Sequence, residues 1–123
     1  MQTNQDEIIY SLQNLQEALD ALEGDRESLA ELLDIFSVEY PRQLAALRGA
    51  IDRKDPVGVR SQAHKLKASV AVFRFHEARN FAAKLEMDGL TGNLSNAADD
   101  LRQLDRSVLE QCPFLATKRS RSS

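Results

Sequence analysis

The chain has 123 residues, of which 42% are hydrophobic and 28% charged, with no tryptophan. This length suits one domain, and the predominance of Leu and Ala over aromatic residues favours helices over strands. The formal net charge of −3 argues against nucleic acid as the main partner. No apolar run approaches the roughly 20 residues of a membrane span, and no signal-peptide pattern is present, so we expect a cytoplasmic protein without membrane insertion. The lone Cys112 excludes an intrachain disulfide and fits a reducing compartment.

Two helices are predicted in the first half of the chain. The tetrapeptide Asn4-Gln5-Asp6-Glu7 has the pattern of a capping box, which indicates a helix that starts there and ends at Gly24. Asp25 can cap the second and longest helix, which contains Pro41. Because proline lacks a backbone N–H and clashes with the preceding turn, we expect a kink near residues 37–40. Apolar residues recur at spacings of three and four along both helices: Ile8, Leu12, Leu15, Leu19 and Leu22, then Leu29, Leu33, Phe36, Tyr40, Leu44, Leu47 and Ile51.

The third predicted helix has a clear start and a clear buried face. Asp55 fits the N-cap and Pro56 the first helical position. The segment Arg74-Phe75-His76 marks a junction with the next helix. The apolar stripe consists of Val59, Ala63, Leu66, Val70 and Phe73.

Two further helices complete the predicted fold. One is expected to end at Gly89, followed by a loop to Asn93, and Asn93 or Ser95 can cap the last helix. Short connections between long amphipathic helices favour antiparallel neighbours. We therefore expect an all-α fold, an antiparallel up-and-down four-helix bundle with an additional N-terminal helix. Residues 1–116 would form this bundle as a monomer, and the basic, Ser-rich residues 117–123 would form a disordered tail. The expected apolar stripes are Ala78, Phe81, Ala82 and Leu85, then Leu94, Ala97, Leu101, Leu104 and Val108.

A histidine on the third helix is the main candidate for chemistry. His64 lies one residue, or about 100°, from the centre of the buried stripe, so it should be exposed. Lys67 and Ala68 follow it by three and four residues and therefore share its face. An imidazole is a nucleophile near neutral pH, a nearby cation suits a phosphoryl group, and a small neighbour leaves room for another protein. The combination predicts a histidine that carries phosphate between proteins.

The residues around His64 resemble the histidine-containing phosphotransfer (HPt) domain family. The resemblance covers roughly residues 5 to 112 and implies a four-helix bundle that displays a histidine on its surface. It rests on the heptapeptide Ala63-His64-Lys65-Leu66-Lys67-Ala68-Ser69, on Phe73, Ala78, Ala82, Leu85 and Glu86 after it, and on Leu33, Phe36, Pro41, Leu44, Leu47, Ala50 and Asp55 before it.

The resemblance also implies a role for each matching residue. His64 would accept a phosphoryl group from an aspartate of a response-regulator receiver domain and pass it to another receiver, within a pathway fed by a hybrid sensor histidine kinase. Lys67 would stabilise the phosphate charge, and Glu86 would face the imidazole. Two positions depart from the family pattern, because Ala68 and Arg74 stand where most members have glycine. The expected receiver-docking face consists of Arg60, Ser61, Lys65, Ala68 and Ala71.

The chain carries no Gly-rich phosphate loop, so we expect a phosphoryl carrier and not an autonomous kinase. No cofactor is expected on the chain itself, since the partner receiver would supply Mg²⁺. His64 and His76 lack a convincing third ligand, so no metal site is predicted. We expect a structural or solvent-exposed role for His76 and a packing role for Cys112. Glu86 and Asp88 are expected on a solvated face, with contact between Glu86 and the imidazole as the alternative that the resemblance implies.

Two other functions stay open. In one, the bundle is a regulatory binding module that docks a receiver or kinase without being phosphorylated, a reading that Ala68 and Arg74 support. In the other, it is a structural helical bundle with a chance motif match, which predicts no receiver binding.

Overall fold

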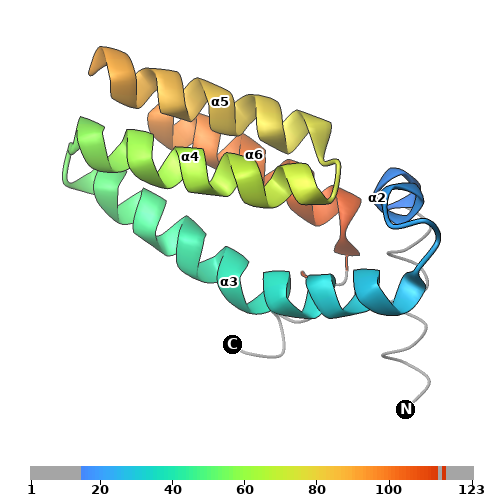
Figure 1. The fold of residues 1–123 in the computed structure, drawn as a ribbon. Helices are drawn as coiled ribbons and strands as arrows, with labels where there is room; N and C mark the ends of the chain where they lie inside the picture. Colours follow the sequence, from blue (N-terminus) through green and yellow to red (C-terminus); the bar gives the residue numbers. More distant parts are fainter. Residues whose placement is uncertain (1–14, 114, 116–123) are drawn as a thin grey trace.

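The computed structural model describes residues 15–113 and 115, and these residues form five helices and no strand. Four of the helices pack as an antiparallel bundle, and the fifth, α2, lies across one end of it (Figure 1). The predicted all-α four-helix bundle with an N-terminal helix is therefore confirmed. The capping box at residues 4–7 and the tail at residues 117–123 lie outside the described residues. The helices are α2 (Gln16–Ala21), α3 (Arg26–Asp52), α4 (Pro56–Val72), α5 (His76–Thr91) and α6 (Ala97–Gln111).

Side-chain caps set the starts of α3 and α4. The carboxylate of Asp25 accepts a hydrogen bond from the Ser28 backbone N–H at 3.1 Å. Asp55 accepts from the Gly58 N–H at 3.1 Å, and Pro56 occupies the first turn of α4. Each bond satisfies a backbone donor that has no partner inside the helix. The predicted start of the His64 helix is therefore confirmed.

The long helix α3 continues through Pro41 and bends in its middle. Pro41 has no N–H, so the carbonyl of Ser37 loses its helical donor and the helix can turn there. In Figure 1 the second half of α3 runs beside α4, whereas its first half passes beneath α2. The bend agrees with the predicted kink, and it lets a single helix contact both the bundle and the N-terminal segment.

The core contains the apolar stripes predicted for α3 to α6. Four aromatic rings gather where α3 meets the α4–α5 junction, with the centroids of Phe36 and Phe73 4.9 Å apart and those of Phe73 and Phe75 5.6 Å apart. Tyr40 stacks on Phe36, and its hydroxyl donates a hydrogen bond to Asp105 at 2.8 Å. None of the helices within residues 15–113 is both long and apolar enough to span a membrane. The buried side chains on the two helices of the site are Val59, Ala63, Leu66, Val70, Ala78, Ala82 and Leu85.

The connection between α5 and α6 differs from the prediction. The expected helix end at Gly89 is wrong, since α5 continues to Thr91 and ends where Gly92 adopts a left-handed backbone with φ of 80°. The expected caps at Asn93 or Ser95 are also wrong, because α6 begins at Ala97 after Asn96. The Asn93 side chain instead accepts from Ser95 within the turn. Gly92 was the effective stop signal, because glycine adopts a positive φ at little cost.

Candidate functional site

His64 projects from α4 on the side away from the core. Its side chain is 67% exposed, whereas the adjacent Ala63 is fully buried. The helical stripe therefore separates a buried face from the face that carries the histidine, as the sequence predicts. The imidazole is accessible to another protein.

Glu86 on α5 links His64 to Lys67. Its Oε2 atom lies 2.8 Å from Nδ1 of His64, and its Oε1 atom accepts a hydrogen bond from Nζ of Lys67 at 2.6 Å. The hydrogen bond from Lys67 lowers the pKa of the Glu86 carboxyl below its ordinary value, and the contact with His64 adds to this effect. Glu86 is therefore a carboxylate at neutral pH.

The contact with Glu86 determines which nitrogen of the ring faces solvent. A carboxylate can only accept a hydrogen bond, so a neutral imidazole that makes this bond carries its proton on Nδ1. The lone pair then sits on Nε2, the nitrogen that does not contact Glu86. The arrangement provides an accessible nucleophilic nitrogen together with a carboxylate that can stabilise positive charge on the ring.

The predicted docking residues lie on the same side of α4 as His64. Four of them are exposed, and the fifth, Ala71, is half-buried. The methyl group of Ala68 occupies the surface one turn beyond His64. An open hollow beside the histidine is lined by Val57, Arg60, Ser61, His64, Lys65 and Glu86.

The sequence prediction missed Val57. This side chain is 77% exposed and lines the hollow beside His64. Its position seven residues, or about two turns, before His64 was the available signal, since residues at this spacing share a helix face. Val57 adds an apolar group to a hollow whose other lining side chains are polar or charged.

The sequence prediction also missed Gly89. A Cβ atom at this position would lie 2.5 Å from the backbone nitrogen of Arg60 and 2.7 Å from the carbonyl oxygen of Pro56. Only glycine allows α5 to approach the first turn of α4 this closely. Since Gly89 is one turn beyond Glu86, this close approach helps to place Glu86 beside His64.

The remaining candidate residues lie apart from this arrangement. His76 contacts Glu17 of α2, with 2.7 Å between Nε2 and Oε2. Cys112 is fully buried at the end of α6. Within residues 15–113 and 115, no three His, Cys, Asp or Glu side chains are placed to hold a metal ion together.

Comparison with known proteins identifies the family. The family model described as the Hpt domain matches residues 31–112, which include α4, α5, most of α3 and all of α6. No curated protein and no solved structure shows a significant match to the chain. Hpt domains take part in histidine phosphotransfer in two-component signalling, and this chain belongs to the Hpt domain family.

Proposed function

We propose that this domain is a phosphorelay intermediate, in which His64 accepts a phosphoryl group from the aspartate of one receiver domain and passes it to another receiver. The observation that carries the proposal is the contact of an exposed His64 with a Glu86 carboxylate that is itself bound to Lys67. The chain then acts as a carrier that takes its phosphoryl group from a partner and not from ATP. A hybrid sensor histidine kinase would feed the pathway, and Mg²⁺ would be bound by the receiver.

The transfer step needs no proton to leave the histidine. The lone pair of Nε2 attacks the phosphorus of the aspartyl phosphate, a P–N bond forms, and the P–O bond breaks with its electron pair leaving on the aspartate. The ring keeps its Nδ1 proton and becomes positively charged. Glu86 stabilises that charge through the bond it already makes to Nδ1. Transfer to the next receiver is the same step in reverse.

Lys67 is proposed as the cation that neutralises the phosphoryl oxygens. An ammonium group has three protons, and the bond with Glu86 uses one of them. Lys67 follows His64 by three residues, so its side chain reaches the space beside the imidazole. Phosphoryl transfer is catalysed mainly by positioning and charge stabilisation, which these two groups supply.

The test is phosphoryl transfer from a receiver domain labelled on its aspartate. We expect wild type to acquire an acid-labile, alkali-stable label, as a phosphohistidine does, and His64→Gln to acquire none. The matched control is His76→Gln, which removes the other histidine of the chain and should still acquire the label. A label that persists in His64→Gln would contradict the proposal.

A second candidate function is a regulatory module that docks a receiver or kinase without carrying phosphate. The exposed methyl of Ala68, one turn from His64, favours it because this side chain narrows the approach of a partner's active site. Under this alternative, His64→Gln and wild type bind a receiver equally and give the same pathway output. Loss of output in His64→Gln, with receiver binding retained, supports the carrier function instead.

A further inference from the structure

The helix that carries His64 is basic on an otherwise acidic protein. The chain has 19 acidic residues, yet none lies between residues 56 and 76. This segment contains four cationic side chains, Arg60, Lys65, Lys67 and Arg74. Such a local excess of one charge favours association with a surface of the opposite charge.

A second hollow lies on the same α4–α5 face, at the junction of the two helices. Ala71 lies seven residues beyond His64 on α4, and Arg79 lies seven residues before Glu86 on the antiparallel α5. At a rise of about 1.5 Å per residue, both helices place this hollow about 10 Å from the His64–Glu86 contact. It is lined by Ala71, Arg74, Phe75, His76 and Arg79.

The two arginines of this hollow carry charge that the described residues do not neutralise. Arg74 and Arg79 are exposed and form no ion pair within residues 15–113 and 115. The acidic Glu17 nearby pairs with His76 instead. Among the described residues, no carboxylate would have to be displaced from either guanidinium group by a partner.

The backbone turn at position 74 does not require an arginine. Its backbone is left-handed, with φ of 60°, and the turn is closed by backbone bonds from Arg74 N–H to Ala71 and from Phe75 N–H to Val70. Glycine adopts this conformation without strain, and the turn requires nothing of the side chain. The turn therefore holds Arg74 without using its guanidinium group, as the turn after α3 holds Lys54 at φ of 55°.

We propose that Arg74 and Arg79 form a second contact with the receiver domain, binding an acidic surface next to its phosphorylated aspartate. This inference rests on the proposed function. A standard protein interface buries about 800 Å² on each partner, which corresponds to a circular patch about 16 Å in radius. A receiver domain centred on His64 therefore also covers a hollow about 10 Å away. Under the proposed function, the receiver brings its aspartate and the carboxylate ligands of its Mg²⁺ to this interface, which would give the interface the negative charge that the two arginines need. The two arginines would then contribute to the rate of association and to the choice of receiver.

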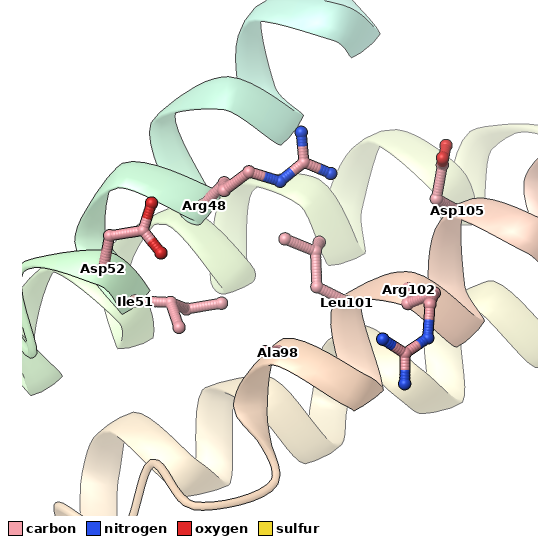
Figure 2. Close-up of a pocket in the computed structure, with 7 residues that line it drawn as sticks. All are labelled: Arg48, Ile51, Asp52, Ala98, Leu101, Arg102 and Asp105. Atoms are coloured by element: carbon pink, nitrogen blue, oxygen red, sulfur yellow. The ribbon is translucent and has the colours of Figure 1, made fainter.

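The test measures the affinity of a receiver domain that exchanges phosphate with wild type, at about 0.02 M and about 0.5 M salt. The test variant is Arg74→Gly/Arg79→Gln, in which glycine suits the left-handed turn. The control is Arg48→Gln/Arg102→Gln, which removes the same charge from the groove between α3 and α6, on the opposite side of the bundle (Figure 2). We expect the test variant to bind about 5- to 10-fold more weakly at low salt, with the difference shrinking at high salt, and the control to bind like wild type.

Three results overturn the inference. Wild-type affinity of the test variant at low salt means that the two arginines do not contact the receiver. An equal loss in the control means that net charge alone matters. In the third result, wild type binds phosphatidylserine vesicles and the test variant does not, while the two bind the receiver equally. The hollow would then contact a membrane surface and not a receiver. The first two results leave labelling of His64 intact, so they do not contradict the proposed function. If no receiver exchanges phosphate with wild type, both the proposed function and this inference are wrong.

Discussion

Glu86 holds His64 in place from the neighbouring helix, with Oε2 of the carboxylate 2.8 Å from Nδ1 of the imidazole across 22 positions of sequence. The same carboxylate accepts a hydrogen bond from Lys67, which lies on the histidine's own helix. One acidic side chain therefore orients the ring, leaves Nε2 as the accessible nitrogen, and keeps the lysine beside it. The two helices that meet here are also those with the most extensive packing in the bundle.

Removing the negative charge of Glu86 should slow phosphoryl transfer to His64. Glu86→Gln retains the shape and can still accept a bond from Nδ1, but it cannot offset the positive charge that develops on the ring. A charged hydrogen bond at a partly exposed site is stronger than a neutral one by about 1 kcal/mol, which corresponds to roughly 5-fold in rate. Single-turnover labelling from a phosphorylated receiver measures the effect.

The control for this prediction is Glu77→Gln, at an exposed position in the first turn of the same helix. It changes the net charge equally and should transfer at the wild-type rate. Equal rates for Glu86→Gln and wild type would mean that the carboxylate does not assist the reaction.

Gly89 should tolerate no side chain. In Gly89→Ala the new methyl would lie 2.5 Å from the Arg60 backbone nitrogen, and backbone atoms cannot move aside cheaply. We expect a loss of about 2 kcal/mol in the free energy of unfolding, despite the better helix propensity of alanine. Urea denaturation measures this loss, and the slower labelling expected from a displaced Glu86 is a second observable.

The matched control is Gly49→Ala on α3. There the nearest atom to the new Cβ is Nη1 of Arg53 at 3.0 Å, the mobile end of an exposed side chain. We expect this variant to gain about 0.5 to 1 kcal/mol from helix propensity. If Gly89→Ala were as stable as Gly49→Ala, the close approach of α5 to α4 would not depend on glycine.

The sequence alone was sufficient to place His64 on an exposed helix face. Asp55 and Pro56 fixed where α4 begins, and the stripe from Val59 to Phe73 fixed which side is buried. These are local signals, since capping and helical periodicity depend on residues within a few turns. The relation of Glu86 to His64 came from the family resemblance, because it depends on the register between two helices.

The errors arose where packing between helices overrides a local signal. Gly89 reads as a helix stop, but it lies inside α5 because α4 approaches it too closely for any side chain. Asp88 was expected on a solvated face, yet its Oδ2 atom is buried, and Asp100 on α6 is only 5% exposed. Neither the position of α4 nor that of α6 could be deduced from the periodicity of α5.

Removing the side chain of Arg74 should stabilise the domain. Arg74→Gly relieves the left-handed strain at φ of 60°, although it also removes a cation near the end of α4 and increases the freedom of the unfolded chain. We expect a net gain of about 0.5 kcal/mol in the free energy of unfolding, measured by urea denaturation. Arg74→Lys should show no such gain because its backbone strain is unchanged. A less stable Arg74→Gly would mean that the arginine contributes to the fold.

Asp88 should make the stability of the domain fall as the pH rises from about 4 to 6. Burial raises the pKa of the Asp88 carboxyl from 3.8 to about 6, and the nearby Asp100 carboxyl adds to the effect. Between pH 3.8 and about 6, Asp88 is mostly protonated in the folded state and mostly ionised in the unfolded state. Raising the pH through this range therefore favours the unfolded state. Asp88→Asn cannot ionise, and it should be more stable than wild type by about 1 kcal/mol at pH 7, after allowance for solvent access. The advantage should vanish near pH 4, where wild-type Asp88 is protonated in the folded state.

Glu110→Gln, at a position 61% exposed, is the control and should follow wild type across the range. A gain for Asp88→Asn that is the same at pH 4 and pH 7 would point to packing and not to the proton.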